Sequence, residues 1–462
     1  MITAKALIEP PIAQRKIKGD GELKRVLQGL CRTDNWTNWL FIARAYVVIA
    51  VSIAGVIWLY NCLAAGNGVL WAILGTAPAA ILAIMAIGAS QHQLAGATHE
   101  ATHHTLFRNK LMNELVSDWL CMFPLISTTY SFRLYHLIHH QFINDPKHDP
   151  DFVVLAESGH WLGFPAAAKQ FYGLMARQLL IFPLLRYIVI RFKSNAVGVE
   201  AANAYKRDGK NSKLPETIGG VWLFGLLTMQ VALAVIAKPW LVLVVGPLYW
   251  LALASFLAIM PELHFPTARL KPVVARRYLA MSRTFFFMAL FSSLTYAQLI
   301  TRQPVWWFFF VLWVIPLVTS FPFFMILRQV VQHGNGDRGW LTNTRVFLVN
   351  PFVKYAAFPF GMDYHLPHHM YATVPHYNLP KLHAVLMKFP EYIQDAIVVE
   401  NYVIPKLHQH PRNPTVVEVL GPSYARSTGD VYIDNTVLDG WDVDEKEEIL
   451  RHAEVEATKP TE

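Results

Sequence analysis

The chain has 462 residues, of which 54% are hydrophobic and only 16% are charged. Ordinary soluble domains carry about 25% charged residues, so this composition excludes an ordinary soluble protein. The net charge of +8 comes without the aromatic and basic pattern of a nucleic-acid binder, so we expect no nucleic acid as a partner. The three cysteines, Cys31, Cys62 and Cys121, form neither a disulfide framework nor a CxxC zinc site.

Apolar runs of about 20 residues, the length that crosses a bilayer, indicate a multi-pass membrane protein. Six crossings are predicted, over Trp39–Tyr60, Val69–Gln91, Ile218–Ala237, Trp240–Met260, Thr284–Ile300 and Val305–Leu327. The segment Phe171–Phe192 is also apolar, but three arginines interrupt it. We therefore predict that it lies in the membrane interface.

The spans define three regions of the chain. Residues 1–38 form a polar, basic segment, residues 39–403 form the membrane domain, and residues 404–462 form a polar, acidic tail of a composition typical of disorder. With six crossings, every long basic segment falls on one side of the membrane. The positive-inside rule makes that side cytoplasmic.

Three histidine clusters are the most informative motifs. They read HxxxHH, HxxHH and HxxHH, and they comprise His99, His103 and His104, then His136, His139 and His140, and then His365, His368 and His369. Because positions i, i+3 and i+4 share one face of a helix, each cluster can aim its imidazoles at one point. Eight or more ligands are too many for one tetrahedral zinc, so the count indicates two metals in one site.

The position of the clusters favours catalysis over transport. Transport sites usually lie near the membrane midplane, with ionisable residues inside the spans. The clusters instead stand in polar segments next to spans, and four predicted crossings between the second and third cluster keep all three on one side. A non-haem di-iron centre that uses dioxygen on an unactivated C–H bond of a lipid-soluble chain suits this placement.

The residues around the clusters carry a family resemblance. The second cluster continues as HHQFINDPKHDPD from His139, and the third reads DYHLPHHMYATVPHYNLPKLH from Asp363. Together with the order of the three clusters, these stretches resemble the membrane fatty acid desaturase family over roughly Trp39 to Phe389. The clusters correspond to the three histidine boxes of that family.

The resemblance implies a fold and an activity. The fold would be all-α, a multi-pass transmembrane helical bundle with a cytosolic helical cap that holds the boxes. Two iron ions, O2 and two electrons from an external donor of the ferredoxin or cytochrome b5 type would introduce a double bond into an acyl chain. The resemblance also implies one further ligand between the last span and the third box, which His333 matches.

Three residues depart from the family pattern. Gln332 precedes His333 where relatives often have Glu, and Asp363 replaces a frequent Asn. Pro367 lies inside the third box and opposes a helix interior, so we expect the helix to start near Pro367 with His365 before it.

The aspartates that follow the second box have two possible roles. Asp145, Asp149 and Asp151 either orient ligating imidazoles from outside or build a solvated turn. We expect the remaining histidines to be surface or supporting residues, and these include His92, His148, His160, His264, His376 and His383.

Two other functions remain open at the level of sequence. A hydroxylase or ketolase of a lipid, sphingoid or carotenoid chain would use the same scaffold, and a zinc-binding membrane hydrolase, receptor or transporter would use fewer histidines. We find no haem-type His-Pro-Gly-Gly element and no ferredoxin-like cysteine set, so the electrons are expected from a separate protein. The absence of an organellar signal favours a bacterial inner membrane over the endoplasmic reticulum.

Overall fold

The computed structural model describes residues 21–197, 205, 214–265, 268–401, 413–425 and 431–451. Most of the basic segment 1–38, the charged loop expected around Lys206–Lys213 and parts of the tail lie outside the described residues.

Helices build most of the described chain and strands only a few residues of it, which confirms the predicted all-α membrane class. Up to the last membrane span these are α1 (Gly21–Leu30), α2 (Thr37–Thr102), α3 (Lys110–Ser117), η1 (Asp118–Met122), α4 (Thr129–Gln141), α5 (Pro150–Glu157), α6 (Ala168–Arg177), α7 (Ile181–Val197), α8 (Leu214–Ile236), α9 (Pro239–Ile259), η2 (Glu262–His264), α10 (Arg276–Thr301), α11 (Val305–Phe309), η3 (Phe310–Val314), α12 (Ile315–Val318) and α13 (Ser320–His333). After it come α14 (Pro351–Ala357), α15 (His365–Met370), η4 (His376–Asn378), α16 (Leu379–Leu386), α17 (Pro390–Asp395), α18 (Val416–Val419), η5 (Pro422–Tyr424) and η6 (Asn435–Leu438). Two short strands, β1 (Val346–Leu348) and β2 (Val398–Glu400), pair in parallel.

Six helical segments in the described chain are long and apolar enough to cross a membrane, and they match the six predicted spans. Their bounds are Thr37–Gly66, Gly68–Thr102, Leu214–Ile236, Pro239–Ile259, Arg276–Thr301 and Val305–His333. The first two are the halves of α2, which bends at Gly68, where φ is 78°. Only glycine adopts this left-handed backbone without strain, so the hairpin turns there.

The apolar segment between Phe171 and Phe192 does not form a straight span. It breaks into α6 and α7, whose axes meet at 86°. A bent pair of this kind is either one broken span or a segment that does not cross, so the interfacial placement stays a prediction. Apart from this pair, the second span ends within the first histidine box, and four spans lie between the second and third boxes.

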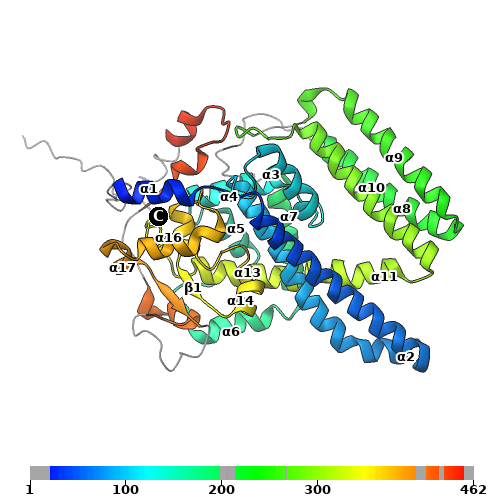
Figure 1. The fold of residues 1–462 in the computed structure, drawn as a ribbon, viewed down its shortest axis with the longest axis horizontal. Helices are drawn as coiled ribbons and strands as arrows, with labels where there is room; N and C mark the ends of the chain where they lie inside the picture. The colour runs from blue at the N-terminus through cyan, green and yellow to red at the C-terminus, as the bar shows by residue number, and fades with distance from the viewer. Residues whose placement is uncertain are drawn as a thin grey trace, which may run out of the picture.

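The spans form two separate parts (Figure 1). Helices α8, α9 and α10 lie together in one part, and α11 leads from them back to the body of the molecule. In the body, α13 lies against α2, and their backbones come close at Gly88. A Cβ at Gly88 would lie 2.0 Å from Ser320 Oγ, so the close approach requires glycine.

The described part of the acidic tail is folded, which differs from the composition-based expectation of disorder. Val437, Leu438 and Ile449 are buried in one cluster with Leu137 and Ile138 of α4. The tail therefore supplies apolar contacts to the helix that carries the second histidine box, and its acidic residues flank that contact.

Candidate metal centre

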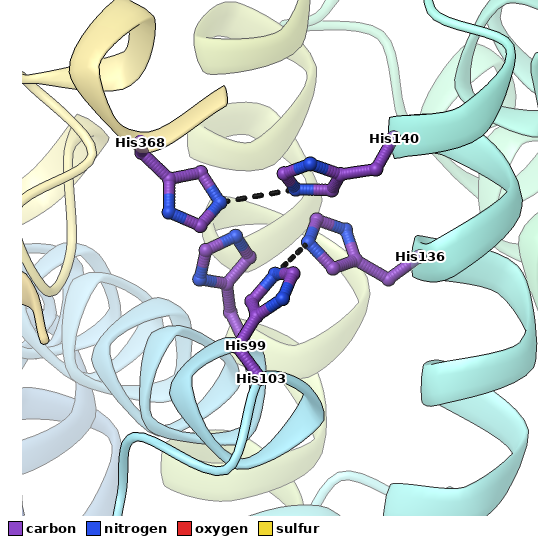
Figure 2. A group of neighbouring side chains, drawn as sticks. All are labelled: His99, His103, His136, His140 and His368. Atoms are coloured by element: carbon purple, nitrogen blue, oxygen red, sulfur yellow. Dashed lines mark hydrogen bonds between the residues drawn. The ribbon is translucent and has the colours of Figure 1, made fainter. Parts of the chain in front are cut away.

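Nine of the ten histidines predicted as ligands converge in two buried groups. Within each group the candidate ligand atoms all lie within 4.8 Å of one another. The first group is shown in Figure 2 and comprises His99, His103, His136, His140 and His368. The second group comprises His139, His333, His365 and His369.

Each HxxHH box serves both groups, whereas the spacing had suggested one point per box. In the second box His136 and His140 join the first group, and His139 joins the second. Positions i and i+4 lie closer in angle on a helix than either does to i+3, so the middle histidine turns toward the neighbouring group. The third box divides in the opposite sense, with only His368 in the first group.

The two groups lie side by side. The His140 and His369 rings, one from each group, stack with their centroids 4.2 Å apart. Ring nitrogens also approach closely within each group, with Nε2–Nε2 distances of 3.0 Å for His103–His136 and for His333–His365. The arrangement therefore offers two adjacent coordination sites.

Four separate segments bring these side chains together. His99 lies in the last turn of α2, and His103 is its C-cap. The second box lies on α4, which Thr128 caps by accepting a hydrogen bond from Ser131 N. His333 ends α13 as predicted, and the third box forms α15.

The structure does not bring His104 into either group. Its backbone has φ of 59°, because the chain leaves α2 at this point. The ring stacks on Trp441 of the tail, with centroids 3.8 Å apart. Trp441 is also covered by the Arg133 guanidinium at 4.0 Å from its ring. His104 thus holds the tail against the site.

Burial keeps the clustered imidazoles in the neutral form that binds metals. It lowers the pKa of His368 to about 3 and holds the pKa values of His136 and His140 well below the ordinary value. Both ring nitrogens of His99, and Nδ1 of His140, are buried without a hydrogen-bond partner. Because buried polar atoms are normally paired, the unpaired nitrogens of His99 fit a bound metal ion in the first group.

His139 differs from its neighbours because it faces a carboxylate. Its Nδ1 lies 2.8 Å from Asp149 Oδ1. Burial disfavours the charged ring, yet Asp149 raises the pKa of His139 above its ordinary value. Asp149 also caps α5 by accepting from Asp151 N. Asp149 therefore orients a histidine and caps α5, and because it is buried the reading of a solvated turn does not hold for it.

The other two aspartates have different partners. Asp151 accepts from Arg191 Nη1 at 2.7 Å and from Tyr135 Oη at 2.6 Å. Asp145 pairs with Arg338 at 2.8 Å. Asp151 thus links α5 to α7, and Asp145 links the turn to the segment after α13.

Sequence reasoning did not single out Glu100, which lies inside the first box. Its buried carboxylate accepts from Thr105 Oγ1 at 2.9 Å and from His376 N at 2.9 Å, and it lies 3.6 Å from His99 Nδ1. His376 is buried as well and contacts Asn38 at 2.8 Å. The sequence feature that could have indicated Glu100 is its position between two predicted ligands, His99 and His103.

The departures from the family pattern have local explanations. Gln332 donates to the Met362 carbonyl at 2.8 Å, a role that an ionised Glu does not fill. Asp363 pairs with Lys354 Nζ at 2.6 Å. Helix α15 begins at His365, so Pro367 lies in its first turn and His365 is helical, against our expectation of a start near Pro367.

A large cavity of about 620 Å³ lies beside the histidine groups, although none of the described histidines lines it. It shares Ala95, Phe132, Arg191 and Met325 with a small pocket that His99, His136, His139 and His365 also line. Its remaining walls come mostly from apolar side chains of the membrane helices. The large cavity therefore borders the pocket that the histidines line.

Two buried histidine groups in a bundle of membrane-spanning helices define an integral membrane protein with a candidate metal centre. The family model described as fatty acid desaturase matches residues 75–269 and 248–399. The chain therefore belongs to the fatty acid desaturase family. It is also similar to dihydrorhizobitoxine desaturase of Bradyrhizobium elkanii, with 30% identity over 143 residues. That alignment covers 30% of this chain and 35% of the relative, so the chain matches about a third of that relative's length.

Proposed function

We propose that this chain introduces a double bond into a fatty acyl chain, using two iron ions in the two histidine groups, O2 and two electrons from a separate donor. The observation that supports this most is the convergence of nine buried histidines beside a mostly apolar cavity. Family membership supports the oxidoreductase chemistry.

The histidines would hold one iron in each group, His99, His103, His136, His140 and His368 in the first and His139, His333, His365 and His369 in the second. When bound, the irons would supply the oxidising power to remove hydrogen from an unactivated C–H bond.

The protein's own residues supply position and exclusion of water. Phe132 and Ala95 line the passage from the large cavity to the histidines. Asp149 fixes the ring orientation of His139, the contribution usual for a carboxylate beside a ligating imidazole. Buried positions for all nine rings keep bulk water from the reacting carbon.

The site belongs, in this proposal, on the cytoplasmic face of a bacterial inner membrane. The boxes lie at the ends of the spans that the positive-inside rule assigns to the cytoplasm. A soluble donor of the ferredoxin or cytochrome b5 type would deliver electrons there.

Lipid mass spectrometry tests the reaction. The chain would be expressed with a competent electron donor, and total acyl lipids compared with those of a host carrying the His140→Ala variant. Products lighter by two hydrogens in the wild type alone are expected. Products heavier by one oxygen would show that the reaction is hydroxylation and not desaturation.

Metal analysis tests the cofactor independently. Purified protein is expected to bind two irons per chain. Binding of zinc alone, without activity after iron is added, would instead support the zinc-binding alternative.

A further inference from the structure

The lining of the large cavity contains charged side chains that an acyl chain alone would not need. Three arginines line it, Arg191, Arg276 and Arg283. Arg191 is neutralised by Asp151 at 2.7 Å and lies over the Tyr135 ring. The other two form no ion pair with a carboxylate in the part of the chain that the structure describes.

Arg276 and Arg283 lie on one face of α10. They are two helical turns apart, and Leu279, Ala280 and Phe287 of the same face line the cavity with them. Arg277 is next to Arg276 but turns away, where it pairs with Glu262 at 2.9 Å and donates to the Met260 carbonyl. The two arginines of the lining that form no ion pair therefore lie on the same face of α10.

Both guanidiniums retain donors for a ligand. Arg283 donates from Nη2 to the Ile126 carbonyl at 2.7 Å, while its Nε is buried without a hydrogen-bond partner. Arg276 lies over the Tyr130 ring at 5.1 Å.

Glu216, at the start of α8, is the carboxylate that also lines the cavity, and the buried Asp118 acts electrostatically on Arg283 as well. Burial raises the pKa of Asp118 to about 7, so it carries only part of a negative charge at neutral pH. With Arg191 and Asp151 paired, the two guanidiniums exceed these carboxylates, so the lining favours an anion.

The residues that line the cavity indicate that its occupant enters from the membrane. They include Trp222 of α8, Leu253 and Leu257 of α9, and Met325 of α13, all within candidate membrane spans. A lipid in the bilayer can reach such a cavity without passing through water. Its volume also lies in the range of about 300–1,000 Å³ that holds small ligands.

We propose that Arg276 and Arg283 bind the phosphate of a membrane phospholipid whose acyl chain fills the cavity and extends to the histidine groups. The identification of this lipid as the substrate rests on the proposed function, but its binding does not. Anchoring of the head group on α10 would fix which carbon of the chain lies beside Phe132.

Lipid binding to metal-free, full-length protein tests the site without any catalytic readout. Native mass spectrometry would follow titrations with phosphatidylglycerol, oleate and oleoyl-CoA. For the double variant Arg276→Gln and Arg283→Gln, we expect phosphatidylglycerol to bind at least about tenfold more weakly, as charge-assisted hydrogen bonds are lost. Arg277→Gln removes a neighbouring charge that does not line the cavity, so it should bind as the wild type does.

A conservative variant separates charge from folding. Arg283→Lys keeps the positive charge and should retain most of the affinity. Equal weakening by Arg277→Gln, or unchanged phosphatidylglycerol binding in the double variant, would overturn the site. If the double variant bound oleate or oleoyl-CoA more weakly but phosphatidylglycerol as tightly as the wild type, the phospholipid would be overturned as the occupant. Because no metal is present, none of these results depends on whether the enzyme desaturates.

Discussion

At the scale of single residues, ring direction divides the histidines more sharply than spacing does. His103 and His104 are neighbours in the chain, yet His103 lies within 3.0 Å of His136 Nε2 while His104 stacks on Trp441. Helix α2 ends at Thr102 with His103 as its C-cap, and the backbone of His104 has φ of 59°, so the two consecutive side chains leave in different directions. A motif that reads HxxxHH therefore contributes two candidate ligands here.

This pair makes a matched test of the first group. His103→Ala is expected to remove bound metal from the first group and to lower activity by more than the roughly 10–100-fold typical of losing an outer-shell partner. His104→Ala should retain the full metal content. Iron per chain, measured on purified protein, distinguishes them. Equal metal loss in both variants would contradict the assignment of His104 to the tail contact.

Asp149 offers a second test, because it supports a candidate ligand without belonging to either group. Asp149→Ala should lower metal affinity or activity roughly 10–100-fold, since His139 loses the acceptor that orients its ring. Asp149→Asn retains an oxygen that can accept from the ring and cap α5, so it should recover part of this loss. An Asn variant as impaired as Ala would show that charge, and not orientation, is what His139 requires.

At the scale of elements, the sequence predicted those parts that depend on local pattern. Hydropathy located all six spans, and the position of His333 just past the last one placed it correctly beside the boxes. The sharing of each HxxHH box between two groups was not predictable, because it depends on how α4 and α15 face each other. The start of α15 at His365 depends likewise on its packing under β1.

The tail shows the limit of composition most clearly. Its acidic residues suggested disorder, but its few apolar side chains pack on α4 and Trp441 lies between His104 and Arg133. Net charge measures how well a segment is solvated, whereas a small number of well-placed apolar residues decides whether it folds on its neighbour.

Trp441→Ala should release this segment. The loss of stacking and cation–π contact, each about 0.5–2 kcal/mol, should raise the rate of limited proteolysis within residues 431–451 several-fold. Metal content should stay unchanged, because Trp441 contacts no residue of either group. Glu447→Gln, at an exposed position of the same segment, is the control. Protease resistance equal to that of the wild type would mean that the apolar cluster alone holds the tail.

At the scale of the whole molecule, the cavity among the membrane helices borders the histidine groups. The large cavity and the small pocket that the histidines line share Ala95 as a wall residue. In the proposed function the acyl chain passes from the cavity to the histidines at this point. The small side chain of Ala95 leaves more room for it than a larger residue would.

Blocking this passage separates substrate access from metal binding. Ala95→Phe is expected to abolish acyl desaturation in whole-cell lipid analysis, because the added ring fills the space between the cavity and the histidines. Iron content should remain at the wild-type level, since Ala95 belongs to neither group. Ala77→Phe, on the exposed surface of the same span, should leave both quantities unchanged. Activity that survives in Ala95→Phe, with iron intact, would show that the acyl chain reaches the histidines by another route.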